Sequence, residues 1–440
     1  MSDLLGIGAS GLRAYSRALS TIGDNIANAQ TPGYARRTLE LQESQAGSNM
    51  PLYRSSVKPG GVAISGITRS VDAWLIEDSR ISSGDAERAA TRLGWMDKVE
   101  VALSDEANGI STGLTRLFTT ADQLTSDPNN RTLRAQFLQA ADDVATGFRT
   151  TAGQLSGMAD GISGAADASV ADLNANLDAL EQINIGLRKA RAGSTNEAGL
   201  LDERDRLLDS IASQMGVTAS FDKHGAVTLR AASGEQLVGG GQVTHVGVTT
   251  AADGRLSFSI GGDAFAPATG GLAGLGQAAD HVADQRAGLD TAAAQFAAQL
   301  NAAHQAGLDA NGNAGQPLFT GTTAATLTAV ALAPDQVAAG DVGSGNGNML
   351  AIGGLRGAND PESVWSGRLA QQAQATTSAR AQSAAAETRA DAASAARFSV
   401  SEIDLDREAA DLLRFQQAYS AAARTIQVAR ETMQALLNAV

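Results

Sequence analysis

Both ends of this 440-residue chain carry a heptad of apolar residues, and this pattern restricts the fold more than any other feature. In residues 3–29 the apolar positions alternate three and four apart. That spacing predicts a coiled-coil seam rather than the wider apolar face of an ordinary surface helix. The seam residues expected at this end are Leu5, Leu12, Tyr15, Leu19, Ile22 and Ile26.

The last 43 residues repeat the pattern, with an apolar or aromatic residue at every seventh position from Leu405 to Val440. Ser399 and Glu402 have the spacing of a capping box, which predicts that the helix begins there. Acidic residues come first and arginines follow, an order that suits the helix macrodipole. The seam residues expected here are Leu405, Leu412, Phe415, Tyr419, Ile426, Met433 and Leu436.

Matching seams at opposite ends of one chain predict a single paired structure. Either helix could instead pack only on the core of its own chain. However, helices at the extreme termini have few neighbours within the chain, and these seams carry few aromatic residues. We therefore expect the seams to pack against other copies of the chain.

The residues between the two ends predict a mainly α-helical chain with an inserted small β domain. We expect the paired terminal helices in 1–60 and 398–440, and a long helical bundle in 61–215, 272–306 and 363–397. Alternating apolar residues and Asp-Gly turns predict the β domain in 216–271, projecting outward. Residues 307–362 are rich in Gly, Asn and Ala, and we expect a loop-rich surface excursion there. Asn184 interrupts a heptad of leucines, and a polar residue at such a position often fixes helix register.

The composition excludes several classes of function. The formal charge of −14 and the absence of a basic cluster argue against nucleic acid or an anionic membrane as the main partner. The chain has no cysteine, which excludes disulfides and thiolate metal sites. We expect neither a cleaved signal peptide nor a membrane span, because no long apolar stretch is present.

Motifs that could carry catalysis or ligand binding are weak. The run from Asp309 to Asn313 resembles the start of a calcium loop, but Ala314 replaces the glycine and Thr320 the glutamate that such a loop needs. The four histidines have no metal-like spacing, and the glycines of 270–276 lack the Lys-Ser/Thr of a phosphate loop. We expect no catalytic residue, no metal and no cofactor.

A short motif at the end of the first helix identifies a family resemblance. Its fixed positions are Ala27, Asn28, Thr31, Pro32, Gly33 and Tyr34. This Ala-Asn-x-x-Thr-Pro-Gly-Tyr pattern resembles the signature of flagellar rod, hook and hook-associated proteins. We expect it to form a fixed turn rather than a binding site, since proline ends the helix and glycine permits the reversal.

Three further segments resemble the hook-associated protein 1 family within that group. One is the C-terminal stretch 403–427, with its Leu-Leu-Arg-Phe segment. The others are the interior runs 200–207 and 301–312. The resemblance implies a structural axial protein of the bacterial flagellum with no enzymatic activity, placed at the hook–filament junction outside the cell.

The same resemblance implies export without a cleaved signal, unfolded, through the flagellar type III apparatus. A flagellar export chaperone would bind the C-terminal region before export. In the assembly, copies would form a ring or helical layer, with hook protein below and a second hook–filament junction protein above. One alternative is a hook or distal rod protein. A more distant one is an axial protein whose β insert binds a ligand or has enzymatic activity.

Overall fold

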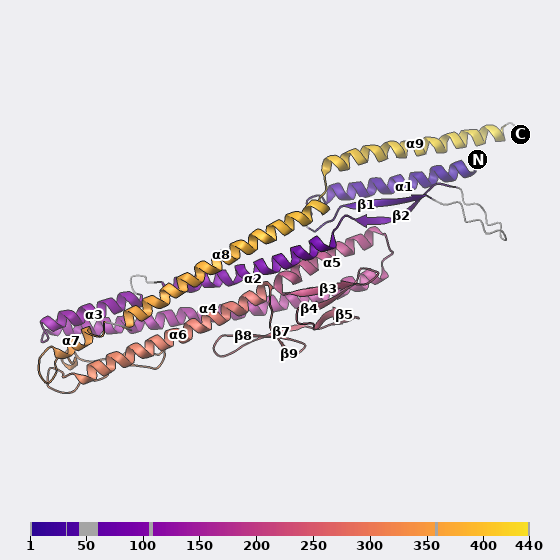
Figure 1. The fold of residues 1–440 in the computed structure, drawn as a ribbon. Coiled ribbons are helices and arrows are strands. Elements are labelled where there is room, and N and C mark those ends of the chain that lie inside the picture. Colours follow the sequence, from indigo (N-terminus) through magenta and orange to yellow (C-terminus); the bar gives the residue numbers. More distant parts are fainter. Residues whose placement is uncertain (1, 32, 44–59, 105–108, 357–359, 439–440) are drawn as a thin grey trace. The chain divides into compact units, whose positions relative to one another are not determined.

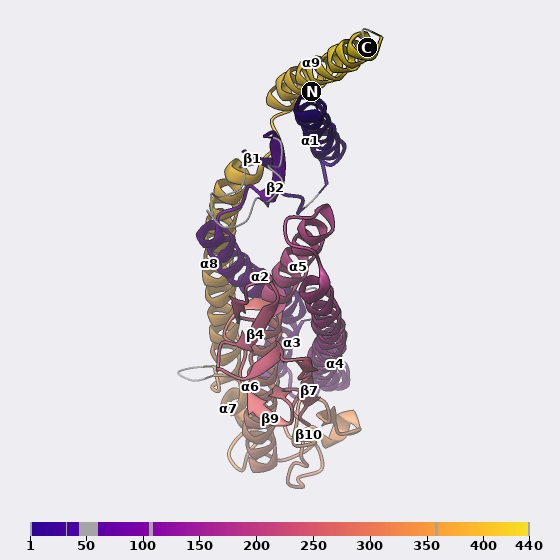
Figure 2. The same ribbon diagram turned by 90° about the vertical axis from the view of Figure 1, so that its right-hand side faces the viewer.

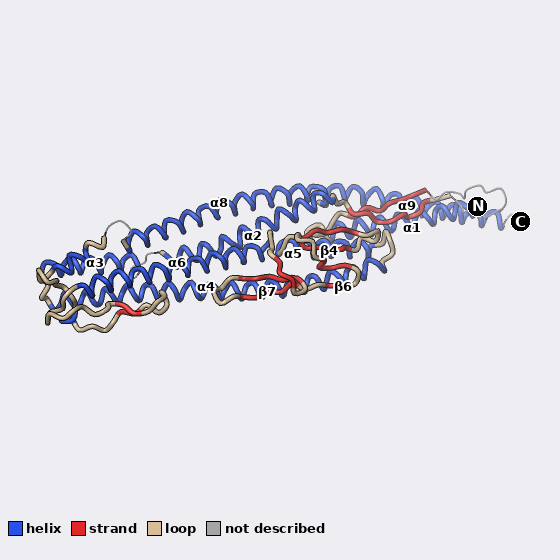
Figure 3. The backbone as a smooth tube through the Cα atoms, turned by 60° about the horizontal axis from the view of Figure 1, so that its bottom comes forward, coloured by secondary structure: helices blue, strands red, loops and turns tan. Residues whose placement is uncertain are grey.

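The computed structural model describes residues 2–31, 33–43, 60–104, 109–356 and 360–438, and all their side chains except those of residues 2, 3 and 436. The helices are α1 Ser2–Ala27, α2 Ala73–Leu103, α3 Ile110–Ser126, α4 Arg131–Lys189, α5 Thr195–Gln214, α6 Gly270–Ala306, α7 Gly347–Gly353, α8 Pro361–Ser401 and α9 Leu405–Leu437, with a 3₁₀ turn at Pro334–Gln336. This confirms the predicted fold class, a mainly α-helical chain with small antiparallel sheets (Figure 3).

The strands form short antiparallel ladders, each closed by local turns. They are β1 Arg37–Glu43, β2 Val62–Arg69, β3 Val217–Phe221, β4 Val227–Ala231, β5 Gln236–Gly239, β6 Gln242–Val243, β7 Val246–Thr250, β8 Leu256–Ile260, β9 Asp263–Phe265, β10 Phe319–Thr320 and β11 Thr328–Ala329. In the part of the chain that the structure describes, the strands form four sheets, in the orders β1-β2, β3-β4-β5-β6, β7-β8-β9 and β10-β11.

The chain divides into two compact units. The first contains residues 1–85, 172–245 and 387–440, and the second contains 86–171 and 246–386. Helices α2, α4 and α8 are continuous and contribute residues to both units. This grouping differs from the four-part division expected from the sequence. Strands β3–β6 fall in the first unit and strands β7–β9 in the second.

In the first unit, the two terminal helices lie side by side and antiparallel, with the N- and C-terminal ends of the described chain together (Figures 1 and 2). The β1–β2 hairpin lies beside α1. Its register pairs Arg37 with Arg69 and Glu43 with Val62, with an irregularity at Glu40/Leu41. This arrangement brings the end of α1, the hairpin and the start of α9 to one place.

The start of α9 differs from the prediction. Ser399 lies inside α8, where its hydroxyl donates to the carbonyl of Ala396, so it caps no helix. The cap is Asp404, whose carboxylate accepts hydrogen bonds from the amides of Asp406 and Arg407 at 3.0 and 3.3 Å. The capping-box prediction was therefore wrong, because α8 continues through Ser401 and an aspartate three residues later supplies an equally good cap.

Asn184 also plays a different part from the one expected. It is fully buried in the part of α4 that belongs to the first unit, and its amide group binds the backbone of β4. Its Nδ2 donates to the carbonyl of Val227 at 2.9 Å, and its Oδ1 accepts from the Val227 amide at 2.7 Å. The residue thus joins a helix to the first residue of an inner strand, where a leucine would leave two backbone groups without partners.

The core of the second unit is aromatic. Phe148 stacks on Phe296 with ring centroids 5.9 Å apart, and Phe296 packs against Phe319 at 4.8 Å. Trp365 of α8 meets the edge of Phe148. The segment 307–356 takes part in this core, because Leu318, Leu327, Val337 and several neighbours in it are buried. It is therefore loop-rich, as expected, but it is a packed part of the unit rather than a surface excursion.

Two side chains of the interior run 301–312 hold segment 307–356 in place through hydrogen bonds to its backbone. Asn301 accepts from the amides of Leu318 and Phe319. His304 is fully buried, with Nδ1 donating to the carbonyl of Gln316 at 2.6 Å and Nε2 accepting from the Ala338 amide at 2.9 Å. Burial lowers the pKa of His304 below its ordinary value, so the ring is neutral in this position.

The turn that resembled a calcium loop is closed by its own backbone. The carboxylate of Asp309 accepts hydrogen bonds from the amides of Asn311 and Asn313, both at 2.8 Å. Desolvation raises the pKa of Asp309, but the hydrogen bonds from Asn313 and Asn311 together outweigh it and hold that pKa below its ordinary value. An Asx turn of this kind reverses the chain after α6.

Candidate functional site

The candidate site is the base of the terminal helix pair, where the family turn, the hairpin and the start of α9 meet. Small residues bring α1 and α9 together. Gly8 and Gly11 face Ile426 and Ala422, and a Cβ placed at Gly8 would lie 2.7 Å from Cγ1 of Ile426. Close approach of two helices requires small residues at the points of contact. Ala14 and Ala18 on the same helix are buried as well.

The predicted seam residues are only partly covered within the chain. Tyr15 and Phe415 meet across the pair with ring centroids 6.2 Å apart. Ile22 is buried; Leu5, Leu12, Tyr15, Leu19, Leu412, Phe415 and Ile426 are half-buried; Ile26, Leu405, Tyr419 and Met433 are exposed. The side chain of Leu436 lies outside the described residues. The pair therefore presents a row of apolar side chains that the described residues leave partly open to solvent.

The family turn is a hydrogen-bonded reversal directly after α1, which ends at Ala27. The amide of Thr31 donates to the carbonyl of Asn28, and the amide of Tyr34 donates to the carbonyl of Thr31. Gly33 has φ +77°, a conformation that disfavours residues with a Cβ. Pro32 lies outside the described residues.

Asn25, two residues before the motif, makes most of the hydrogen bonds of this region. Its Oδ1 accepts from the hydroxyl of Tyr34 and from the amide of Arg37, both at 3.0 Å. Its Nδ2 donates to the carbonyl of Arg37 at 2.9 Å. Burial raises the pKa of Tyr34 to about 12, although Arg37 opposes the shift, so the hydroxyl keeps the proton that it donates. The motif tyrosine thus fixes the orientation of a buried asparagine.

Glu408 connects Asn25 to α9. It is fully buried, and its carboxylate accepts from Nδ2 of Asn25 at 3.1 Å and from Nε of Arg36 at 2.7 Å. The backbone adds a further link, because the amide of Arg36 donates to the carbonyl of Ser401. A buried carboxylate is tolerated only where charged and hydrogen-bonding partners compensate its desolvation, as they do here.

Below the turn lies a cluster of buried ion pairs, which we call the arginine–aspartate cluster. Asp202, Asp205 and Asp209 lie three and four residues apart on one face of α5. Arginines from five elements reach them. They are Arg37 of β1, Arg69 of β2, Arg80 of α2, Arg204 of α5 and Arg397 of α8.

Asp205 is the centre of that cluster. It pairs with Arg69 at 2.7 Å and with Arg204 at 2.6 Å. Burial alone would raise the pKa of Asp205, but the two guanidinium groups outweigh it and hold that pKa below its usual range. Removing one member of such a group leaves an uncompensated buried charge, which costs about 3–5 kcal/mol. The cluster therefore fixes the hairpin, α2, α5 and α8 to one another within the first unit.

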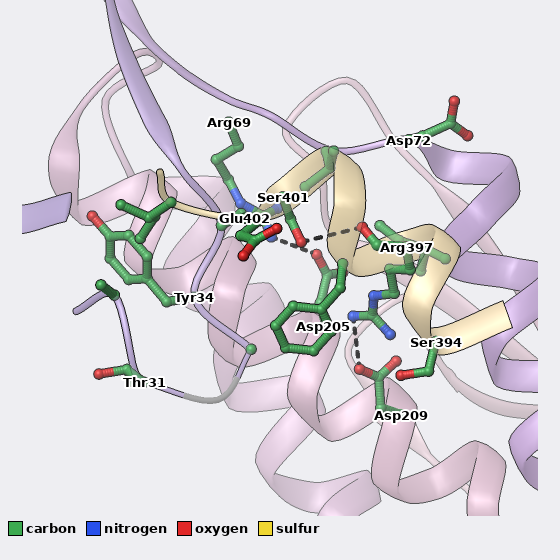
Figure 4. Close-up of a pocket in the computed structure, with 17 residues that line it drawn as sticks. Thr31, Tyr34, Arg69, Asp72, Asp205, Asp209, Ser394, Arg397, Ser401 and Glu402 are labelled. Carbon is green, nitrogen blue, oxygen red and sulfur yellow. Dashed lines mark hydrogen bonds and ion pairs between the residues drawn. The ribbon is translucent and has the colours of Figure 1, made fainter. Parts of the chain in front are cut away.

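A cavity of about 260 Å³ opens between the turn and the end of α8 (Figure 4). Arg397 and Asp209 pair on one side of it at 2.8 Å, and Tyr34, Thr31 and Glu402 lie around it. Its apolar wall is formed by Ala29, Ala35, Val71, Ile76, Phe398 and Ile403. No three histidine or carboxylate side chains in the described ranges are grouped as a metal ion would require.

Sequence reasoning identified the turn but missed the arginine–aspartate cluster and the link from Asn25 to Glu408. One signal was available, since all but four of the 33 basic residues are arginine. Arginine suits buried, multiply hydrogen-bonded ion pairs better than lysine does. The second signal was the spacing of Asp202, Asp205 and Asp209, which share one face of a helix and are suitable partners for such arginines.

Comparison with known proteins identifies the family. Residues 96–319, just over half of the chain, match the family described as flagellar hook-associated protein FlgK helical domain. The chain belongs to the FlgK family. Both ends of the chain match broader flagellar families, residues 5–34 the flagella basal body rod protein and residues 397–439 the flagellar basal body rod FlgEFG protein C-terminal.

Relatives in the FlgK family include three proteins named flagellar hook-associated protein 1. That of Salmonella typhimurium is 30% identical over 73% of this chain and 60% of its own length. The Escherichia coli protein is 27% identical over 72% of this chain and 60% of its own. The Bacillus subtilis protein is 23% identical over 97% of this chain and 96% of its own. The chain thus spans about 60% of the length of the first two relatives.

A solved structure of the flagellar hook junction protein FlgK from Burkholderia pseudomallei is also similar. It is 20% identical, with a TM-score of 0.49 over 55% of this chain and 46% of that one. Among the described residues of the present chain, no helix has both the length and the apolar character needed to cross a bilayer.

Proposed function

We propose that this chain is a structural axial protein that joins the flagellar hook to the filament and has no enzymatic activity. The observation that carries the proposal is the terminal helix pair. It is tied together at its base by Asn25 and Glu408, and its apolar seam is left partly open along its length. Membership in the FlgK family supports the position at the junction. The matches of both ends to rod-protein families support assembly through these ends.

In this proposal the seam residues pack against other axial subunits. Leu12, Leu19, Leu412 and Ile426 are half-buried in the single chain, and Ile26 and Tyr419 are exposed. Packing between copies would remove this apolar surface from water, at about 25 cal/mol per Å². Such a contact is heterologous, because a surface on one copy meets a different surface on its neighbour. Heterologous contacts build an open helical layer or a ring.

The partners follow from that position. Hook protein would lie below the layer and the second junction protein above it, and the chain would leave the cell through the flagellar type III apparatus. An export chaperone would cover the C-terminal region beforehand. An exposed apolar helix such as α9 needs a cover of this kind in the cytoplasm.

A deletion strain tests the proposal. We expect hooks of normal length without filaments, and flagellin monomers shed into the medium. Complementation with the intact chain restores filaments, and immunogold labelling places it in one band between hook and filament. Loss or shortening of the hooks themselves would instead support the alternative of a hook or distal rod protein.

A further inference from the structure

The arginine–aspartate cluster of the first unit holds more positive than negative charge. Five guanidinium groups reach three carboxylates, so two of the positive charges have no aspartate of their own. Most of these side chains are buried, and a buried charge needs an opposite charge or hydrogen bonds to compensate its desolvation. The balance of charge therefore favours one further anion beside the cluster.

Arg397 is the cluster member that is best placed to bind this anion. Its Nη2 donates to Oδ2 of Asp209 at 2.8 Å, and the described residues offer its guanidinium group no other acceptor. Asp209 is itself shared, because its Oδ1 accepts from Nε of Arg80 at 2.7 Å. The guanidinium group of Arg397 borders the cavity of about 260 Å³ between the family turn and the end of α8 (Figure 4). Its remaining N–H groups form a planar fork that matches a carboxylate.

The wall of the cavity is largely apolar. It is formed by side chains at the start of α2 and around the end of α8, namely Val71, Ile76, Phe398 and Ile403. A cavity of roughly 150 Å³ holds benzene, so 260 Å³ leaves room for a ring or a short alkyl chain that carries a charged group. An inorganic anion would pair with Arg397 but leave this wall in water. The wall and the guanidinium group together fit a small carboxylate with an apolar body.

Glu402 also borders the cavity and opposes an anion. It is exposed and has no ion pair among the described residues. Water and salt screen an exposed charge strongly, whereas the side chain of Arg397 is only 22% exposed and is screened less. The carboxylate of Asp72, also at the cavity, accepts hydrogen bonds from the amides of Trp74 and Leu75 at 2.9 and 3.1 Å. The attraction of Arg397 therefore prevails, and Glu402 only lowers the affinity.

We propose that this cavity is a binding site for a small monocarboxylate with an apolar body. The carboxylate pairs with Arg397, and the body lies against Phe398 and Ile403. Because the family turn also lines the cavity, through Thr31 and Tyr34, a bound molecule contacts both the turn and the end of α8. It therefore stabilises the first unit against unfolding by an amount that grows with its concentration. The site is independent of the proposed role at the hook–filament junction.

Titration of the full chain with benzoate tests the site. Isothermal titration calorimetry at low ionic strength should detect binding, and benzoate should raise the midpoint of thermal unfolding. Benzamide has a similar shape without the charge, and it should bind about tenfold more weakly because it loses a charge-assisted hydrogen bond. Equal affinity for benzoate and benzamide, or no binding of benzoate, would overturn the proposal and leave the proposed function intact.

Variants of two residues test whether Arg397 holds the carboxylate. Arg397→Gln should weaken benzoate binding about tenfold, whereas Glu402→Gln should strengthen it by removing a like charge. Glu387→Gln, at an exposed position of α8 that does not line the cavity, should leave the affinity unchanged. If circular dichroism shows that Arg397→Gln does not fold, Glu402→Gln decides alone, because its side chain is exposed. Unchanged or weaker binding by Glu402→Gln, or full binding by a folded Arg397→Gln, would contradict the site.

Discussion

Asn25 of α1 and Glu408 of α9 stand 383 residues apart in the sequence and share a hydrogen bond of 3.1 Å between two buried side chains. The bond closes the base of the terminal helix pair. It does so beside the motif tyrosine, Tyr34, which orients the same asparagine. The family motif thus acts on α9 through one buried carboxylate.

Replacing that carboxylate should loosen α9. Glu408→Gln keeps the shape but removes the charge that holds Nε of Arg36 at 2.7 Å, and we expect a loss of about 2 kcal/mol. Hydrogen–deuterium exchange of the α9 amides should accelerate. Glu431→Gln, an exposed substitution on the same helix, is the matched control. Equal exchange in the two variants would show that Glu408 does not hold the helix.

Gly8 and Gly23 offer a paired test of helix contact. Gly8→Ala places a Cβ 2.7 Å from Ile426, whereas no heavy atom lies within 4 Å of a Cβ at Gly23. Alanine favours a helix interior over glycine by about 1 kcal/mol, so Gly23→Ala should slow amide exchange in α1. Gly8→Ala should accelerate it, because the helices must separate. Slower exchange in both variants would mean that α1 and α9 do not touch at Gly8.

Asp205 should be the most sensitive member of the arginine–aspartate cluster. Asp205→Asn leaves Arg69 and Arg204 buried without their carboxylate, at a cost of about 3–5 kcal/mol. Chemical denaturation followed by circular dichroism measures the loss. Glu203→Gln, on an exposed side of the same helix, should change stability by less than about 1 kcal/mol. Similar losses in both variants would contradict a central role for Asp205.

His304 should make the second unit sensitive to acid. The pKa of His304 is lowered by burial, so the unfolded chain takes up a proton at a higher pH than the folded chain does. Stability is then complete above the ordinary pKa of about 6.5 and falls as the pH drops below it. The free energy of unfolding, followed by tryptophan fluorescence, should decline from pH 7 to pH 5.

Replacing His304 tests whether this residue causes the pH dependence of the free energy of unfolding. His304→Gln should be less stable at pH 7 but show a flatter decline toward pH 5. His224→Gln, a partly exposed substitution in the first unit, should keep the decline of the unmodified chain. An unchanged slope in His304→Gln would assign the acid sensitivity to other groups.

Periodic features of the sequence predicted the structure best. Leucines and isoleucines repeated over several turns define a helix whatever its neighbours, so the helical class and the terminal pair followed from Leu5–Ile26 and Leu405–Met433. Single polar residues predicted it poorly. Ser399 had the spacing of a cap, yet the chain remained helical to Ser401 and Asp404 took the role. Local spacing does not reveal which of two nearby caps a helix uses.

Long-range pairing was the part that sequence could not supply. Asn184 had the spacing of a register-fixing residue in a heptad, but its partner, Val227, belongs to a strand 43 residues away. The arginines of the cluster likewise come from five separate elements and meet only in the folded unit. Segment 307–356 lacks any period, so its buried residues could not be distinguished from surface loop. These features depend on which elements become neighbours, which composition does not encode.

The most direct test of the account is whether the apolar seam of the terminal helices attaches filaments. The seam variant carries Leu412→Asp and Ile426→Asp together in one chain. The control carries Gln417→Asp and Gln427→Asp, which place the same charges on exposed positions of the same helix. Electron microscopy of complemented deletion cells should show bare hooks with the seam variant and normal filaments with the control. Circular dichroism should show that the helical body remains folded in both. Normal filaments on cells that carry the seam variant would contradict the account.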